Sequence, residues 1–193
     1  MEKGTGIILL YKGNESKQNN EGFSLVELIV VMAMMFILVG GMSISASLVF
    51  SRDAAQCASK LNDAIYTARM DSMSKPGAYF MQIKKVAGEF EVVLNDGTSD
   101  VYSEKISENG KIKAISFDLN GENGQITDSN TVKIVFDKSK GYVKTFNDKE
   151  ITTDGANGTY KDGLIVFTVS QKTGTKTEDV TLVTSTGKHK VGK

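Results

Sequence analysis

Residues 22–50 read GFSLVELIVVMAMMFILVGGMSISASLVF and decide how the rest of the chain is organised. The segment is apolar almost throughout and holds one charged residue, Glu27, with the next charge only at Arg52. A helix needs roughly twenty predominantly apolar residues to cross the hydrocarbon core of a bilayer, and Leu28–Phe50 provides them. A carboxylate close to such a span is costly, which marks Glu27 as a functional residue.

The pattern GFSLVE at residues 22–27, followed by an apolar helix, resembles the processing signal of type IV prepilins and pseudopilins. The resemblance implies that a prepilin peptidase, which is also a methyltransferase, cuts between Gly22 and Phe23 and methylates the new amine of Phe23. It further implies that the Glu27 carboxylate of an incoming subunit meets the N-terminal amine of its neighbour in a growing filament. Pairing two charges at low dielectric offsets the desolvation that each would suffer alone.

Two other kinds of segment could carry such an apolar run. A secretory signal peptide places its apolar region before the cleavage site, whereas here the polar residues 1–22 come first. An uncleaved signal anchor needs only the apolar run and leaves Glu27 without a role. Lys and Arg are nearly balanced around the two ends of the run, so only the resemblance places the leader in the cytoplasm and the C-terminal part outside.

Composition narrows the classes of function that the rest of the chain can have. The 193 residues carry 23 Lys and Arg against 23 Asp and Glu, so no global basic field points to nucleic acid. Cys57 and His189 are the only residues of their kinds, which argues against an intrachain disulfide, a zinc site and Ser/His/Asp or Cys/His hydrolase chemistry. Asp118 opens a stretch that superficially suggests a calcium loop but lacks the glycine and the bidentate Glu of that motif. We predict no enzyme activity, no cofactor and no metal.

The apolar periodicity continues beyond the apolar run. Small and apolar residues recur at spacings of three and four and predict one buried helix stripe: Ala54, Ala58, Leu61, Ile65, Ala68 and Ser72. The helix should end before Pro76, because Pro restricts its predecessor and lacks the backbone donor. The sequence therefore predicts one helix over Ser24–Ser74, with an amphipathic second half that packs on the globular part.

From Ala78 onward the periodicity becomes that of strands. Eight strands are predicted: Tyr79–Lys84, Phe90–Leu94, Val101–Ile106, Lys113–Phe117, Val132–Phe136, Tyr142–Phe146, Leu164–Val169 and Val180–Thr184. Asn95–Gly97 and Asp137–Gly141 read as hairpin turns, and Asn120–Thr131 and Asn147–Gly163 as surface loops.

A helix followed by strands predicts an α+β fold, with an antiparallel sheet packed on one side of the helix. The predicted organisation is a leader at 1–22, a transmembrane and assembly helix at 23–51, an amphipathic helix at 52–75 and an extracytoplasmic β-rich domain at 76–193.

The end of the chain adds a second resemblance. The segment VTLVTSTGKHKV, residues 180–191, is similar to the closing strand and basic turn of GspH/FimT-type minor pseudopilins. Lys188, Lys190 and Lys193 form a small basic cluster there, which we expect to be a solvated terminal turn. Contact with DNA is the alternative, because Lys side chains neutralise phosphates and release counterions.

These observations predict a structural subunit, a minor pilin or pseudopilin of a type IV pilus, a type II secretion system or a competence filament. Its expected partners are the prepilin peptidase, other pilins or pseudopilins, the inner-membrane assembly platform and membrane lipid. We expect a single-pass protein of the cytoplasmic membrane whose C-terminal domain lies outside and later joins a filament at the cell surface. The alternative is a monomeric, membrane-anchored module that binds DNA or a secreted substrate.

Overall fold

The structure is a computed structural model that describes residues 23–50, 52–108, 110–156, 158–173 and 175–192, with the side chains of 40–50 excepted. The chain divides into two compact units, residues 1–43 and residues 44–193. The strands and the buried core described below all belong to the second unit.

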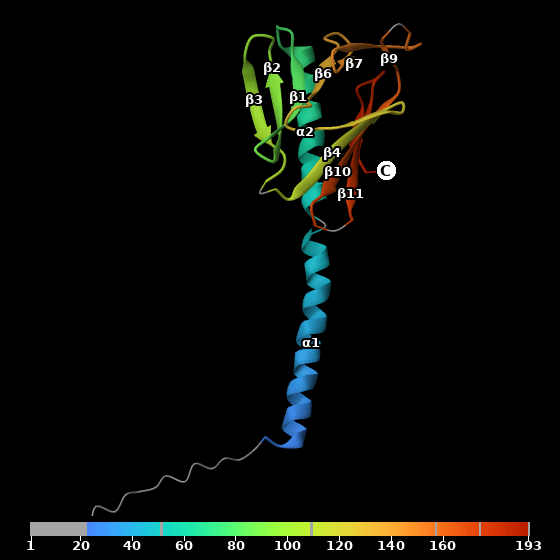
Figure 1. The fold of residues 1–193 in the computed structure, drawn as a ribbon. Helices are drawn as coiled ribbons and strands as arrows, with labels where there is room; N and C mark the ends of the chain where they lie inside the picture. The colour runs from blue at the N-terminus through green and yellow to red at the C-terminus, as the bar shows by residue number, and fades with distance from the viewer. Residues whose placement is uncertain (1–22, 51, 109, 157, 174, 193) are drawn as a thin grey trace, which may run out of the picture. The chain divides into compact units, whose positions relative to one another are not determined.

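Helix α1 covers Leu25–Phe50 and helix α2 covers Arg52–Ser74 (Figure 1). At the start of α1, the Leu28 amide donates to the Ser24 carbonyl at 3.1 Å, so Ser24 lies at the cap position where Ser is favoured. The predicted helix over Ser24–Ser74 is confirmed on both sides of Ser51, which lies outside the described residues.

Helix α2 buries one face and ends where the sequence predicts. All six residues of the predicted stripe are buried, together with Cys57 and Ala64. The last backbone bond, from the Lys75 amide to the Asp71 carbonyl, closes the helix directly before Pro76. Small side chains on this face allow the strands to approach α2 closely.

The strands form two sheets rather than the one that the sequence predicts. The seven-stranded sheet has the order β3-β2-β1-β6-β7-β8-β9 and the five-stranded sheet the order β12-β11-β10-β4-β5. The first contains β1 Phe80–Val86, β2 Glu89–Asn95, β3 Asp100–Lys105, β6 Val132–Phe136, β7 Val143–Phe146, β8 Lys149–Thr152 and β9 Tyr160–Lys161. The second contains β4 Ile112–Leu119, β5 Glu122–Gln125, β10 Leu164–Gln171, β11 Thr177–Val183 and β12 His189–Val191.

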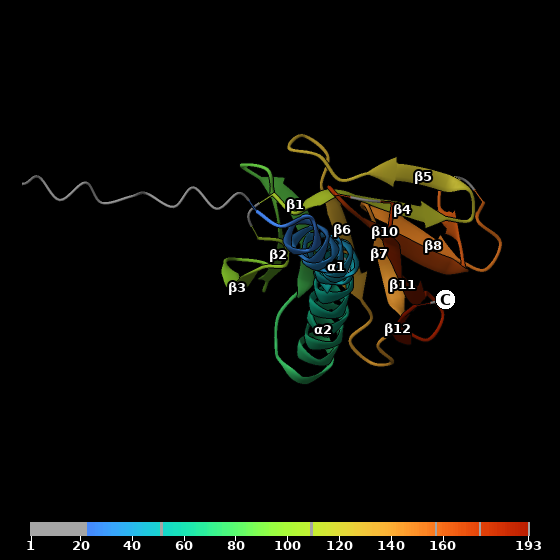
Figure 2. The same ribbon diagram turned by 90° about the horizontal axis from the view of Figure 1, so that it is seen from below.

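Two sheets are needed because one helix stripe cannot cover the apolar faces of all the strands. The two sheets pack against each other through aromatic rings, with Phe117 of β4 edge-on to Phe146 of β7 at 5.3 Å and Phe167 of β10 tilted against Phe146 at 6.5 Å between centroids. Beside this aromatic centre, α2 inserts Leu61 and Ile65, both fully buried. Figure 2 shows α2 with strands of both sheets around it.

Both predicted hairpin turns are confirmed, since β2 pairs with β3 and β6 with β7 in antiparallel register. The Asp96 carboxylate accepts bonds from the Thr98 hydroxyl and amide and from the Ser99 amide. These bonds, chiefly that of the Thr98 hydroxyl, lower the pKa of Asp96 to about 2.

The two predicted surface loops are partly wrong. Asn120–Thr131 contains β5, and Asn147–Gly163 contains β8 and β9, which pair with each other in parallel. These strands have two to four residues each, too short for an alternating pattern to be visible in the sequence.

Candidate functional site

The segment that carries the predicted processing and assembly residues begins at the first described residue. Phe23 is 82 % exposed, and Glu27 lies exposed in the first turn of α1. Acidic side chains are favoured there, because the unpaired amides of the first turn give the helix end partial positive charge. Gly22, with the predicted cleavage bond, lies outside the described residues.

Apolar side chains of α1 are exposed on every side of the helix over its described side chains. The large ones, from 45 % to 78 % exposed, are Leu25, Val26, Leu28, Ile29, Val30, Val31, Met32, Met34, Met35, Phe36, Ile37, Leu38 and Val39. An apolar surface of this extent marks a contact with lipid or with other proteins. Over the residues that the structure describes, however, no helix reaches the length and apolarity of a membrane span. The predicted span Leu28–Phe50 therefore stays a prediction.

The predicted basic cluster at the end of the chain is not a terminal turn. His189–Val191 forms β12, which pairs with β11 through Thr181↔Lys190 and Leu182↔His189. Lys188 and Lys190 are exposed, while Lys193 lies outside the described residues. The His189 ring lies beside Tyr66 of α2, with 6.1 Å between their centroids. The two lysines are solvated as expected, but the segment forms a strand rather than a turn, because β11 offers an edge to which it adds; a contact with DNA stays a prediction.

Arg69 of α2 connects the two sheets at one end of the unit. Its Nε donates to the Gly141 carbonyl at 2.8 Å and a terminal guanidinium nitrogen donates to the Thr186 carbonyl at 3.1 Å. Gly141 precedes β7 and Gly187 follows Thr186 in the turn before β12. A Cβ built on Gly187 would lie 2.0 Å from the Gly141 carbonyl oxygen and 2.7 Å from Arg69 Nε. The three residues therefore pack too closely for any side chain at Gly187.

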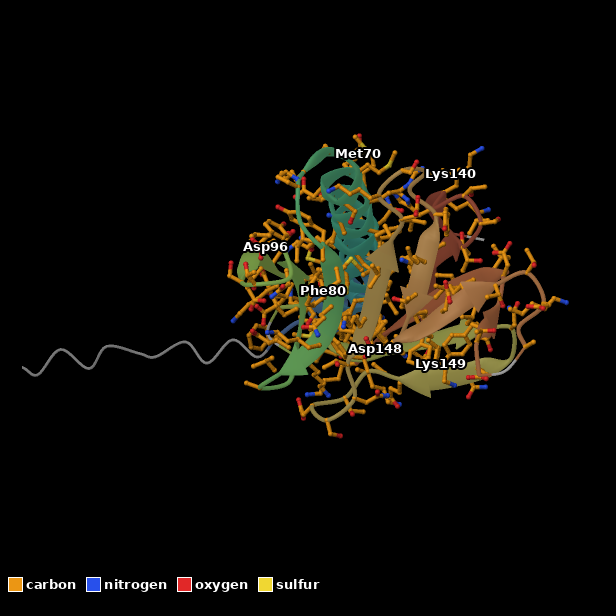
Figure 3. All side chains as sticks on the ribbon, turned by 90° about the horizontal axis from the view of Figure 1, so that it is seen from above. Met70, Phe80, Asp96, Lys140, Asp148 and Lys149 are labelled. Carbon is orange, nitrogen blue, oxygen red and sulfur yellow. The ribbon has the colours of Figure 1, made fainter. Side chains whose placement is uncertain are left out.

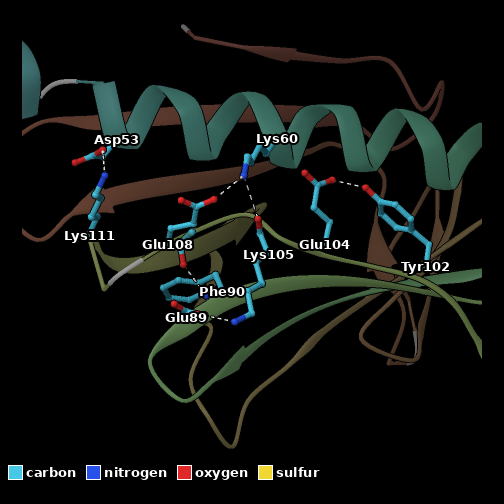
Figure 4. Close-up of polar contacts among 10 residues, drawn as sticks. Asp53, Lys60, Glu89, Phe90, Tyr102, Glu104, Lys105, Glu108 and Lys111 are labelled. Carbon is cyan, nitrogen blue, oxygen red and sulfur yellow. Dashed lines mark hydrogen bonds and ion pairs between the residues drawn. The ribbon is translucent and has the colours of Figure 1, made fainter.

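The other end of α2 carries a row of ion pairs with the loop between β3 and β4. Lys111 pairs with Asp53 at 3.3 Å, and Lys60 pairs with Glu108 at 3.7 Å while donating to the Lys105 carbonyl at 3.2 Å (Figure 4). The Phe90 amide also donates to the Ser107 hydroxyl, at 2.6 Å. These contacts hold the loop on the helix, and the hollow between them, lined by Cys57 and Ile106, has room for about one water.

Two further candidates from the sequence have structural roles. Cys57 is 2 % exposed, and burial raises the pKa of its thiol to about 12, so it packs as a small buried side chain. In the suspected calcium loop, the Asp118 carboxylate accepts a hydrogen bond from the backbone amide of Gly121. The side-chain amide of Asn120 donates to the Lys161 carbonyl. Among the described residues no group of three or more His, Cys, Asp and Glu is placed to hold a metal ion.

Comparison with known proteins adds one finding. Residues 17–43 match the family model of the prokaryotic N-terminal methylation motif. Neither the curated proteins nor the solved structures gave a match. The matched segment contains Gly22, Phe23 and Glu27, the residues that the sequence singles out for cleavage, methylation and assembly.

The methylation motif, within which the exposed apolar helix α1 begins, supports the class of type IV prepilins and pseudopilins. The motif implies processing by a prepilin peptidase and assembly with other pilins.

Proposed function

We propose that this chain is a structural subunit of a type IV pilus, type II secretion or competence filament, a minor pilin or pseudopilin of the GspH/FimT type. The observation that carries the proposal is the exposed Glu27 in the first turn of a helix whose described side chains are apolar and exposed on every side. Such a helix needs lipid or other helices around it, and its one carboxylate needs a cation.

The proposed path begins with insertion of the apolar run into the cytoplasmic membrane, with the second unit on the outer side. The peptidase cuts after Gly22 and methylates Phe23, and the new ammonium supplies the cation. The assembly platform then moves the subunit into a filament, where Glu27 pairs with the N-terminus of a neighbour. The attraction between the two charges then offsets the cost of removing each of them from water. On this proposal the chain is not an enzyme and needs no cofactor.

Substitution of Glu27 tests the assembly step. Glu27→Gln removes the charge and keeps the shape, so we expect normal insertion and cleavage but about tenfold less copurification with other pilins, a loss of about 1.4 kcal/mol. Glu150→Gln is the matched control, because it makes the same change at an exposed carboxylate of β8, outside the helix. Equal copurification of wild type and Glu27→Gln would overturn the pairing.

Lys188 and Lys190 favour a second candidate, a monomeric anchored module that contacts DNA through these exposed ammonium groups. This candidate predicts binding of duplex DNA that weakens steeply with salt and is lost in Lys188→Ala/Lys190→Ala. It also predicts a chain that purifies without other pilins. Copurification therefore separates the two functions.

A further inference from the structure

Each sheet of the second unit ends in a strand that flanks α2. Among the described strands, β3 is one outer strand of the seven-stranded sheet and β12 one outer strand of the five-stranded sheet. Lys60 touches the end of β3 through the Lys105 carbonyl, and Tyr66 touches β12 through the His189 ring. Six residues along a helix turn it by about 600°, so Lys60 and Tyr66 point about 120° apart. The two strands thus lie on different flanks of the helix, as Figure 2 shows.

The other ends of the two sheets lie close to each other. Glu122 of β5 pairs with Lys149 of β8 at 3.9 Å, and the side-chain amide of Asn120, just before β5, donates to the carbonyl of Lys161 in β9 at 2.6 Å. Among the described residues, β3 and β12 contact α2 at their edges but pair with no further strand there. In β3 every residue except Glu104 is exposed, including Val101 at 45 % and Tyr102 at 40 %, and in β12 Lys190 and Val191 are exposed.

The two edges carry opposite charge. Asp100 and Glu104 are the carboxylates of β3, and Asp96, whose pKa is lowered, lies in the turn before it. The one cation of β3, Lys105, pairs with Glu89 at 2.7 Å. On the other flank, Lys188 and Lys190 are exposed, and neither has an ion-pair partner among the described residues.

An outer strand offers unpaired backbone amides and carbonyls, which another strand can complete. We propose that the β3 edge of one copy of this chain pairs with the β12 edge of a second copy. Because the two surfaces differ, the contact is head-to-tail. The inference rests on the proposed function and names the neighbouring subunit as another copy of this chain.

The contact between the two edges is expected to be weak by itself. The three residues of β12 allow only a few backbone bonds, and exposed ion pairs contribute little each. Subunits held together through their N-terminal helices raise the local concentration of the two edges, so that a weak contact becomes occupied. Pairing is therefore expected in assembled material from the full-length chain.

Cysteine crosslinking between copies tests the contact. Val101→Cys and Val191→Cys replace one exposed side chain on each edge, and Cys57 stays in place because it is buried. We expect a mixed disulfide dimer when the two variants, carrying different tags, are expressed in the same cells and oxidised. The matched control replaces Val191→Cys by Thr175→Cys, an exposed turn position off the β12 edge. A mixed dimer no more abundant than in this control overturns the inference.

Charge reversal tests the complementarity. Asp100→Lys/Glu104→Lys should lower the dimer yield about fivefold, the factor expected for two exposed ion pairs. Adding Lys188→Glu/Lys190→Glu on the other chain should restore the yield. If the lysine reversals instead abolish retention of DNA and leave crosslinking unchanged, the basic edge serves DNA and the inference is wrong.

Copurification distinguishes a failure of the edge pairing from a failure of the proposed function. A chain that copurifies with other pilins but gives no mixed dimer overturns the edge pairing and leaves the proposed function standing. A mixed dimer in a chain that never copurifies with other pilins supports the edge pairing as self-association and overturns the proposed function.

Discussion

Arg69 Nε donates to the Gly141 carbonyl at 2.8 Å, so that one side chain of α2 joins the turn before β7 to the turn before β12. This charged donor with its two backbone carbonyls is one of the polar contacts that join the two sheets, and the backbone bond from the Val143 amide to the Thr184 carbonyl, at 2.8 Å, lies beside it. Met70 on α2 and Lys140 on the turn before Gly141 are labelled in Figure 3, which looks onto this end of the unit.

Arg69→Lys is expected to lower the thermal stability of the second unit. A Lys side chain keeps the charge but cannot reach both carbonyls, and each lost bond to a charged donor costs about 1.5–3 kcal/mol. We expect a fall in Tm of about 4–8 °C by scanning calorimetry. Arg52→Lys, an exposed position at the start of α2, is the control and should leave Tm unchanged.

Gly187→Ala is expected to be more damaging than its backbone angle alone explains. Gly187 has φ +66°, and its Cβ would overlap the Gly141 carbonyl oxygen, whereas Gly88 has φ +84° and open space around it. Gly88→Ala thus isolates the cost of the left-handed backbone, about 1–2 kcal/mol. If calorimetry gives the two variants equal losses, the close packing at Arg69 contributes nothing.

The Cys57 thiol is expected to resist alkylation in the folded chain. Burial raises its pKa to about 12, so hardly any thiolate exists at pH 8. We expect iodoacetamide to react with Cys57 only after unfolding, in parallel with loss of the tyrosine circular dichroism signal. Rapid labelling of the native chain at pH 8 would show that α2 does not pack on the sheets as described.

The turn between β2 and β3 is expected to keep the hydrogen bonds of Asp96 down to low pH. Because the pKa of Asp96 is lowered in the folded chain, the stabilisation from its hydrogen bonds is complete above the ordinary carboxyl pKa and is lost as pH falls through about 2. Amide chemical shifts of Thr98 and Ser99 should follow this transition by NMR, and Asp96→Asn should remove it. A midpoint near pH 4 would mean that the turn is not formed in solution.

The α+β class, the end of α2 and both hairpin turns could be predicted from the sequence, because their causes are local: the small-residue stripe from Ala54, Pro76, and the Asx turn at Asp96. The division into two sheets could not, since β4 pairs with β10 across about fifty residues through Phe117↔Phe167. No local sequence pattern predicts which distant strands pair with each other.

Within the candidate site, the motif around Glu27 could be predicted because all of its parts lie within six residues. The contacts of Arg69 could not, since its partners Gly141 and Thr186 are distant in sequence and bind through backbone carbonyls, which every residue has. The sequence does contain a turn signal for the β7–β8 hairpin, the adjacent Asn147 and Asp148, whose φ angles are 49° and 61°. The strands on either side are too short to show an alternating pattern, so the hairpin was not predicted.

Mass spectrometry of the N-terminal peptide, on protein purified from its native membrane, tests the central claim most directly. The account predicts a mature chain that begins at Phe23 and carries one methyl group on its amine. A chain that retains residues 1–22 in cells with an active prepilin peptidase would contradict it.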